Sequence, residues 1–305
     1  MLITSASLRD LFAGFKTSFN AGFTAAEATY PKIAMEVTSD GSAETYAWLG
    51  QFPRIREWLG DRIIHSLSIQ DYAIANRLFE VTVSVPRTNV EDDKLGVFGP
   101  LFQNMGQETK QHPDTLVYEL LSSGFTKKCY DGQPFFDPDH PVDESIGPPK
   151  SYSNMQAGSS PAWFLLDGTK PIKPLVFQKR TPYEFQRMDG ADTENVFLKD
   201  EYLYGVRARA SAGFALWQLA YASKAPLTPE NYEAARTAMK GVRGEHGRKL
   251  GIKPSILIVP DELEGDALRL LKNETRVITA GEPPTTVTIA NEWAGSAELV
   301  VSPFL

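Results

Sequence analysis

The residues of this chain that could do chemistry gather in one stretch, 129–144, which runs Cys-Tyr-Asp-Gly-Gln-Pro-Phe-Phe-Asp-Pro-Asp-His-Pro-Val-Asp-Glu. It contains the one cysteine of the chain, one of its four histidines and several carboxylates. Two carboxylate oxygens and an imidazole can together bind a divalent metal ion. Asp137, Asp139 and His140 are therefore the candidate ligands of a metal-dependent hydrolase.

The same stretch is also typical of a rigid structural loop. Three of its positions are proline, and it follows a predicted helix whose end we place at Gly124. The remaining histidines are scattered, and the chain has no His-Glu-x-x-His pattern. Because short acidic clusters match metal-binding patterns freely, we favour the structural loop and predict no bound metal.

Other catalytic chemistry has weaker support. Cys129 follows Lys127 and Lys128, which would lower the pKa of a thiol, but no signature of a cysteine nucleophile surrounds it. The glycine-rich stretch 241–251 lacks the Gly-Lys-Ser/Thr ending of a phosphate-binding loop, and a predicted helix precedes it instead of a strand. No Gly-x-Ser-x-Gly elbow occurs. We therefore predict no catalytic residue and no cofactor.

Composition narrows the class of protein. The 305 residues carry a formal net charge of −7, and no block of Lys and Arg predicts a nucleic-acid surface over the whole molecule. A single cysteine excludes a disulfide within the chain. No run of roughly 20 apolar residues could span a bilayer, and we expect no secretory signal.

The elements that must position these residues begin with an amphipathic helix. Ser7 is the predicted N-cap, and Pro31 prevents any continuation. Helical spacing places an apolar stripe on one face, which we expect to pack on something beyond the helix itself: Leu8, Leu11, Phe12, Phe15 and Phe19.

Residues 32–87 predict an extended, strand-rich excursion with a charged tip. Tip residues 54–62 combine Arg54, Arg56 and Arg62 with Trp58. Arginine and tryptophan are enriched at interface hot spots, and Trp58 lies beside Ile55 and Leu59. We therefore predict contacts with another subunit here, against the alternative of a merely solvated tip.

The rest of the chain predicts a mixture of helices and strands, an α+β fold. We expect a helix over 95–123 with a kink at Pro113, and then irregular loops and short strands over 131–182. The further expected elements are a strand at Tyr202–Arg209, a helix at Phe214–Ala222, a helix capped by Thr228, a buried strand at Ile256–Val259, a helix from Asp261 to Leu271 and a terminal strand from Glu298. The region 225–280 predicts a small α/β unit.

Several stretches, in the same order along the chain, resemble the Mu-like phage major head subunit family over nearly the full length. They are Lys32-Ile-Ala-Met, Tyr46-Ala-Trp-Leu-Gly-Gln-Phe-Pro, Cys129-Tyr-Asp-Gly-Gln-Pro-Phe-Phe-Asp-Pro-Asp-His-Pro, Asn195-Val-Phe-Leu, Glu201-Tyr-Leu-Tyr-Gly-Val, Trp217-Gln-Leu-Ala, Asn231-Tyr-Glu-Ala-Ala-Arg and Ala297-Glu-Leu-Val-Val-Ser-Pro. So many matches in one order are far more specific than a single motif.

The resemblance implies the capsid fold of tailed phages. It divides the chain into an N-terminal arm (1–45), an extended loop (46–85), a peripheral domain (86–224 and 286–305) with a spine helix near 95–123, and an axial domain (225–285). The stretch 129–144 then becomes a family fingerprint.

The resemblance also implies a function. Copies of the chain would form pentamers and hexamers and close into an icosahedral shell around double-stranded phage DNA, contacted non-specifically. Implied partners are a scaffold, a maturation protease and the portal, and no membrane; the location is the virion capsid, assembled in the bacterial host cytoplasm. The predicted inter-subunit contacts are Phe12, Phe15, Phe19, Arg54, Arg56, Trp58 and Arg62. A cellular nanocompartment of the same fold and the metal hydrolase are the alternatives.

Overall fold

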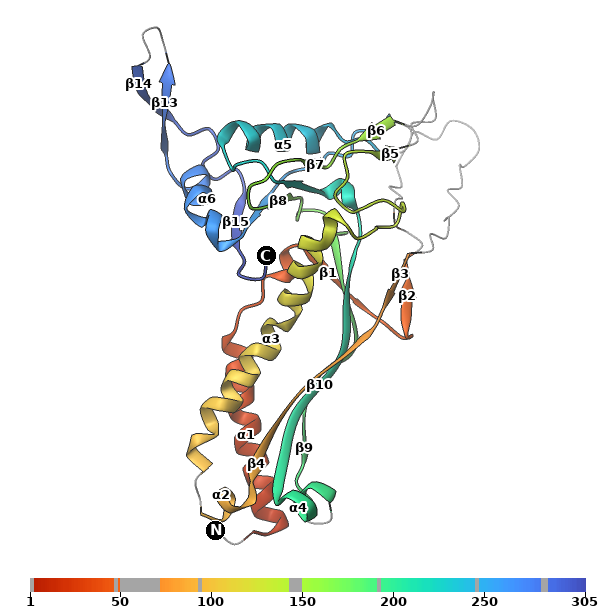
Figure 1. Cartoon of the computed structure of the whole chain (residues 1–305), viewed down its shortest axis with the longest axis vertical. Coiled ribbons are helices and arrows are strands. Elements are labelled where there is room, and N and C mark those ends of the chain that lie inside the picture. Colours follow the sequence, from red (N-terminus) through yellow and green to blue (C-terminus); the bar gives the residue numbers. More distant parts are fainter. Residues whose placement is uncertain are drawn as a thin grey trace.

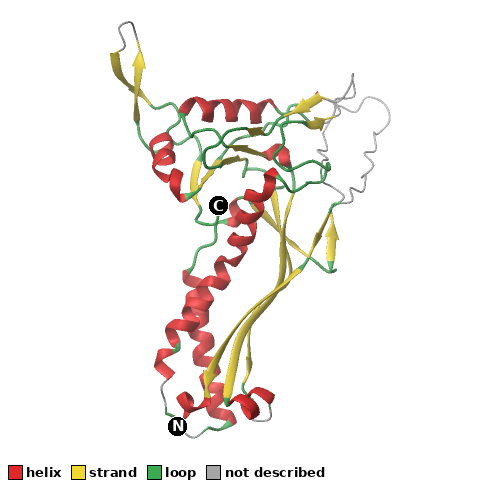
Figure 2. Cartoon of the chain, in the orientation of Figure 1, coloured by secondary structure: helices red, strands yellow, loops and turns green. Residues whose placement is uncertain are grey.

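The computed structural model describes residues 3–46, 49, 72–92, 95–142, 150–190, 193–244, 247–280 and 285–305. Figure 1 shows an elongated lower part, built from two helices and a long sheet, and an upper unit of mixed helices and short strands. Helices and strands are interleaved along the chain (Figure 2), which makes the fold α+β as predicted.

The N-terminal helix α1 (Ser5–Ala25) packs along the long helix α3 (Gly99–Ser122) in the lower part. The N-cap is Thr4, so the prediction of Ser7 was wrong. Ser7 instead completes a capping box: its backbone N–H donates to Thr4 Oγ1 (3.1 Å), and its hydroxyl accepts from the Thr4 N–H (2.8 Å). This reciprocal pair satisfies two backbone donors and starts the helix earlier.

Two glycines allow α1 and α3 to approach closely. A Cβ on Gly22 would lie 1.8 Å from the carbonyl oxygen of Gln103, and one on Gly106 would lie 2.0 Å from that of Phe19. Any larger residue at these positions must therefore separate the helices. Gly22, which costs intrinsic helix stability, is needed for this packing.

Helix α3 is shorter at both ends than the predicted 95–123. It begins at Gly99, with Pro100 in the first turn where proline is favoured, and Leu95–Val97 forms a separate 3-10 turn, η2. The expected glycine cap at Gly124 was wrong: α3 ends at Ser122, and Gly124 lies inside the 3-10 turn η3 (Ser123–Phe125). A Cβ on Gly124 would lie 2.7 Å from the Phe136 ring, so packing explains this glycine.

The long sheet has the strand order β1-β9-β10-β4. Its strands are β1 (Ala34–Thr38), β4 (Arg77–Pro86), β9 (Leu175–Met188) and β10 (Glu201–Phe214), and β10 is antiparallel to both neighbours. Irregular loops and short strands were expected up to Pro182, but β9 is a long strand that continues through this residue. The β9–β10 register shifts at this point, and such a bulge is where a strand tolerates proline.

The helix predicted at Phe214–Ala222 was also wrong. Strand β10 ends at Phe214, and the 3-10 turn η4 (Trp217–Leu219) leads into β11 (Ala220–Ser223). The side chains of β11 are all buried. A short, continuously apolar run does not distinguish a buried strand from a buried helix, which explains the error.

The upper unit contains a five-stranded sheet in the order β15-β12-β8-β11-β7. These strands are β7 (Met155–Gln156), β8 (Trp163–Leu166), β11, β12 (Ile256–Val259) and β15 (Glu298–Val301). Helix α5 (Pro229–Gly241) begins with the predicted cap, since Thr228 Oγ1 accepts from the Asn231 N–H (3.2 Å). The turn η6 (Asp261–Leu263) and helix α6 (Glu264–Leu271) confirm the predicted helical segment after β12.

Small elements complete the chain. The hairpin of β13 (Thr275–Ala280) and β14 (Thr285–Ala290) extends away from the upper unit (Figure 1). The others are η1 (Tyr30–Lys32), β2 (Ala43–Thr45), β3 (Ala73–Ala75), α2 (Arg87–Glu91), β5 (His140–Val142), β6 (Lys150–Tyr152) and α4 (Glu194–Lys199). Among the described helices, none combines the length and apolar character needed to cross a membrane.

Candidate functional site

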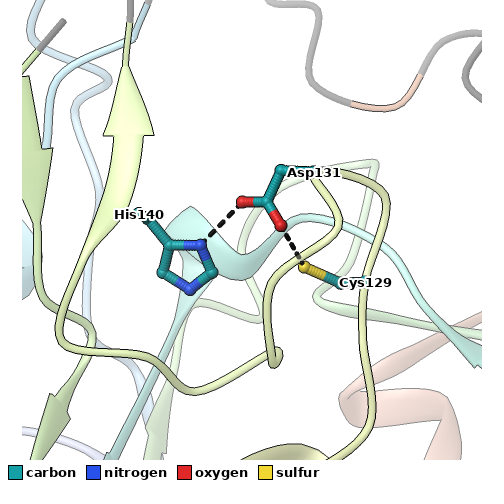
Figure 3. A group of neighbouring side chains, drawn as sticks. All are labelled: Cys129, Asp131 and His140. Atoms are coloured by element: carbon teal, nitrogen blue, oxygen red, sulfur yellow. Dashed lines mark hydrogen bonds and ion pairs between the residues drawn. The ribbon is translucent and has the colours of Figure 1, made fainter.

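The loop that begins at Cys129 connects η3 to strand β5. It turns tightly: the Cys129 N–H donates to the Gln133 carbonyl (2.8 Å), and the Gly132 N–H donates to the Cys129 carbonyl (3.1 Å). Gly132 has φ of +83°, a conformation that glycine adopts without steric cost. This turn brings Asp131 between the side chains of Cys129 and His140 (Figure 3).

Among the described residues, Cys129, Asp131 and His140 form a group that could hold a metal ion, because their ligand-type atoms lie within 4.8 Å of one another. One carboxylate oxygen of Asp131 accepts from the Cys129 thiol (3.1 Å), and the other lies 2.6 Å from His140 Nδ1. The His140 ring is fully buried and stacks on Trp217, with ring centroids 4.0 Å apart. Each group of this cluster therefore already has a partner within the cluster.

The electrostatics of the cluster favour a protonated thiol. Burial raises the pKa of Cys129 far above its usual value, and the negative charge of Asp131 raises it further. Burial alone would raise the pKa of Asp131, but the hydrogen bonds from His140 and Cys129 outweigh that effect and lower it. Metals and electrophiles require the thiolate, so the arrangement is that of a structural hydrogen-bond network.

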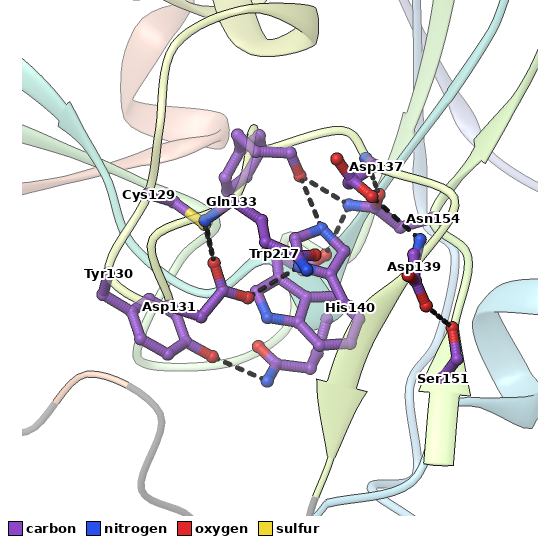
Figure 4. A network of polar contacts seen from close by, with 12 residues as sticks. Cys129, Tyr130, Asp131, Gln133, Asp137, Asp139, His140, Ser151, Asn154 and Trp217 are labelled. Atoms are coloured by element: carbon purple, nitrogen blue, oxygen red, sulfur yellow. Dashed lines mark hydrogen bonds and ion pairs between the residues drawn. The ribbon is translucent and has the colours of Figure 1, made fainter. Parts of the chain in front are cut away.

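Asp137, Asp139 and His140, the candidate ligands of the disfavoured hydrolase alternative, do not form one cluster, because the three side chains have different partners. The Asp139 N–H donates to Asp137 Oδ1 (2.9 Å), as in an Asx turn, and the Asp139 carboxylate accepts from the Ser151 hydroxyl (Figure 4). His140 is paired instead with Asp131. Sequence spacing singled out Asp137 and Asp139, which are nearer to His140 along the chain. The turn at Gly132 instead brings the more distant Asp131 to the His140 ring.

Polar side chains that the sequence analysis missed join this loop to the upper sheet. Asn154 accepts from the Asp137 N–H (2.9 Å) and donates to the Phe135 carbonyl (2.8 Å), and Gln218 donates to the Tyr130 hydroxyl (2.8 Å). Asn154 and Gln218 are buried. The network thus holds the segment after α3 against the upper unit.

The apolar stripe of α1, predicted to meet another subunit, has its partners within the chain. Phe15 and Phe19 are buried; the Phe15 ring centroid lies 4.3 Å from that of Phe102, and the Phe19 centroid 5.0 Å from that of Phe185. Half-buried Phe12 stacks on Phe185 at 5.5 Å. Within the single chain α3 and the long sheet cover this stripe, and the contact of Phe12, Phe15 and Phe19 with another subunit stays a prediction.

The other predicted contact residues, Arg54, Arg56, Trp58 and Arg62, lie outside the described residues. Exposed apolar side chains occur on several other elements, including two that the sequence analysis did not single out. Phe197 (85% exposed) and Leu198 (64%) project from α4, and Val277 (65%) and Val287 (43%) from the β13–β14 hairpin. Both elements are short and lack the periodicity that marks an interface in sequence.

A cavity of about 340 Å³ lies between α3 and the long sheet, lined by side chains of α3, β4, β9 and β10. His112 lies in its wall and contacts the Tyr183 hydroxyl through Nδ1 (2.6 Å) and the Phe79 ring, whose centroid is 4.4 Å away. Burial lowers the pKa of His112, as does the nearby positive charge of Arg77, so the ring is neutral at pH 7.

The whole fold matches solved shell proteins. A chain from the procapsid of bacteriophage JBD30 superposes with a TM-score of 0.85 at 40% identity, covering 99% of this chain and 100% of that one. A chain from the JBD30 capsid gives a TM-score of 0.75 at 30% identity, with 92% of each chain covered. The fold is therefore that of a tailed-phage major capsid protein, the class that the resemblance predicted.

Sequence comparisons give the particular family. Residues 8–305 match the family described as Mu-like prophage major head subunit gpT, and the chain belongs to this family. It is 39% identical to the major capsid protein of Escherichia phage Mu over 311 residues, with both chains fully covered. It is also 39% identical to the Mu-like prophage FluMu major head subunit of Haemophilus influenzae, over 90% of this chain and 91% of that protein.

The predicted function is thereby confirmed: the chain is a major capsid protein, which forms the phage head shell by self-association. The cellular nanocompartment and the metal-dependent hydrolase are not favoured.

Proposed function

We propose that copies of this chain form pentamers and hexamers that close into an icosahedral shell around double-stranded DNA in the host cytoplasm. The observation that carries this proposal is the match of nearly the whole chain to both a procapsid chain and a capsid chain. A scaffold, a maturation protease and the portal are the proposed partners during assembly. The net charge of −7 suits a lumen that contacts DNA weakly and releases it.

The division into domains is part of this proposal. The proposed segments are an arm (1–45), an extended loop (46–85), a peripheral domain (86–224 and 286–305) and an axial domain (225–285). The long helix α3 supports the assignment of a spine helix, and α5, α6 and the β13–β14 hairpin lie together at the outer side of the upper unit (Figure 1). On this assignment β13 belongs to the axial domain, and the boundary after residue 285 places β14 from residue 286 onward in the peripheral domain.

We propose that the extended loop contacts a neighbouring subunit through Arg54, Arg56, Trp58 and Arg62. Trp58→Ala should lower the yield of shells while leaving the melting temperature of the unassembled chain unchanged, because the tryptophan acts between subunits. Shell yield is counted by negative-stain microscopy. A normal yield from this variant would exclude a contact role for Trp58.

The shell is proposed to be non-covalent. A lysine on the extended loop would be the nucleophile for a cross-link, and residues 33–93 contain none. Boiled particles should therefore run on a denaturing gel as a single band at the 33.8 kDa of the chain. A ladder of multimers that survives boiling and reductant would overturn this proposal.

We also propose that the chain has no catalytic activity of its own. Support comes from Cys129, whose raised pKa keeps the thiol protonated, and from Asp131 and His140, which are paired with each other. Purified chain should contain much less than one equivalent of zinc or other transition metal by elemental analysis. A stoichiometric metal retained through dialysis against chelator would reopen the hydrolase alternative.

A further inference from the structure

The upper unit carries opposite charges at two places. The acidic end consists of four carboxylates in and next to the first turn of α6, with no cation among residues 261–266: Asp261, Glu262, Glu264 and Asp266. The basic end consists of four cations at the end of α5 and in the loop that follows it: Lys240, Arg243, Arg248 and Lys249. The basic segment contains one acid, Glu245, which lies outside the described residues.

Helix α5 separates the two ends. Its N-terminal turn is near the hairpin that follows α6, because Arg276 Nη1 lies 3.7 Å from Glu230 Oε1. Its C-terminal turn carries Lys240 and leads directly into the basic loop. A helix of 13 residues is about 20 Å long. Figure 1 shows α6 and the hairpin together at one end of α5, so the basic loop lies toward the other.

The basic end has a defined backbone conformation. Arg243 and Lys249 form an antiparallel bridge, and the Gly244 N–H donates to the Arg248 carbonyl (2.9 Å). Arg243 Nη1 donates to the Gly247 carbonyl (2.8 Å), and Lys170 adds a further cation by donating to the Leu250 carbonyl (3.3 Å). Both of these side-chain bonds are to carbonyl oxygens, so Arg243 and Lys170 are held in place without an ion pair to any of the described residues.

The acidic end is similarly uncompensated and stands beside an apolar projection. Within the described part of the chain, no ion pair involves Asp261, Glu262 or Glu264, whereas Asp266 pairs with Arg269. The neighbouring hairpin has one charged residue, Arg276, in its two strands and exposes Val277 and Val287. A two-stranded hairpin with a single charged residue and exposed valines is a surface that proteins normally cover.

We propose that the acidic end and hairpin of one copy dock against the basic end of the next copy. The inference rests on the proposed self-assembly and specifies which surfaces meet. The two surfaces differ from each other, so the contact is heterologous, and heterologous contacts that close generate rings. Opposite charges set the direction of the contact and exclude the reversed arrangement, in which like charges would face each other.

A charge-swap experiment on the full-length chain tests this assignment. The acidic-end variant is Glu262→Lys with Glu264→Lys, and the basic-end variant is Lys240→Glu with Lys249→Glu. Each should lower the assembled fraction, measured by sedimentation velocity and microscopy, by about tenfold or more, since like charges facing each other cost several kcal/mol. The chain carrying all four substitutions should recover most of the wild-type fraction.

Controls separate this effect from misfolding and from net charge. Glu27→Lys with Glu119→Lys changes the net charge by as much as the acidic-end variant, at exposed sites on other elements, and should assemble normally. The neutral variant, Glu262→Gln with Glu264→Gln, should weaken assembly less than the lysine variant does. It also avoids placing cations at the start of α6, where they would destabilise the helix. Circular dichroism melts of all variants report whether the chain remains folded.

The outcomes are distinct. Recovery in the combined variant supports the head-to-tail contact. The contact is overturned if the acidic-end variant and the basic-end variant both assemble normally. It is also overturned if the chain with all four substitutions is folded but does not recover assembly. Wild-type chain that never sediments above the monomer would instead contradict the proposed self-assembly, and so the two failures are distinguishable.

Discussion

The Cys129–His140 loop and the outer elements α4 and β13–β14 use their side chains in opposite ways. In the loop, groups capable of chemistry are buried and paired: Asp131 holds the Cys129 thiol and the His140 ring, and Trp217 covers that ring. In the outer elements, groups with no chemistry are exposed: Phe197 is 85% and Val277 65% accessible. In an enzyme, such groups would be expected to line a pocket that a substrate can enter.

The contrast explains how this sequence serves a shell. Polar residues of the loop fix the junction between α3 and the upper unit, so that one rigid subunit can be repeated. We propose that the apolar residues on projecting elements make contacts between copies, where burial supplies most of the association free energy. The residues of the 129–144 stretch therefore helped to identify the protein family, but they did not identify a catalysed reaction.

The largest effect is expected from a comparison of a buried phenylalanine, Phe15, with an exposed one, Phe197. Phe15→Ala should lower the free energy of unfolding of the unassembled chain by about 3–5 kcal/mol, because it leaves a cavity between α1 and α3. The matched Phe197→Ala should change it by less than about 0.5 kcal/mol, since the side chain is exposed. Urea unfolding of both variants measures the difference, and equal effects would break the comparison.

A smaller loss is expected at the loop. Asp131→Ala removes the acceptor of two buried donors and should destabilise the chain by roughly 2–4 kcal/mol, at about 1–3 kcal/mol per unsatisfied group. Asp139→Ala is the control, because Asp139 is exposed and its loss should cost much less. If Asp131→Ala is as stable as the wild type, the cluster is not structural.

Helix packing should show an effect of opposite sign at two glycines. Gly106→Ala places a methyl group against the Phe19 carbonyl and should cost about 1–3 kcal/mol of unfolding free energy. Gly14→Ala, in α1 with nothing within 4 Å of the new methyl group, should stabilise by up to about 1 kcal/mol through helix propensity. Thermal denaturation of the two variants separates the effect of helix–helix contact at Gly106 from the effect of helix propensity at Gly14. If both variants are stabilised, α1 and α3 are packed less closely than the structure shows.

The smallest expected effect depends on pH. The pKa of His112 is lowered from 6.5 by burial and by Arg77, so the unfolded chain binds the proton more readily than the folded chain. Stability should therefore fall as the pH drops below about 6.5 toward the lower folded-state pKa. In His112→Gln this decline should be shallower, as measured by urea titrations between pH 7 and pH 5; an unchanged slope would show that His112 is not the group responsible.

Some of this architecture was predictable from local patterns. The capped helix after Thr228, the buried strand at Ile256–Val259 and the long helix ending near residue 122 each carry a signal in consecutive residues. The pairing of His140 with Asp131 depends on a positive φ at Gly132, which sequence spacing does not reveal. The covered state of Phe15 and Phe19 depends on Gly22 and Gly106, which lie 84 residues apart and let two helices touch. Strand β11, in the segment where a helix was predicted, depends on β8, which pairs with it from elsewhere in the chain.

The central claim, that this chain acts by assembling and not by turnover, is tested most directly by electron microscopy of the purified full-length protein, with metal analysis of the same sample. Closed shells of uniform size, with no stoichiometric metal, are the predicted result. A monomer that never assembles and retains one metal ion per chain would contradict the account.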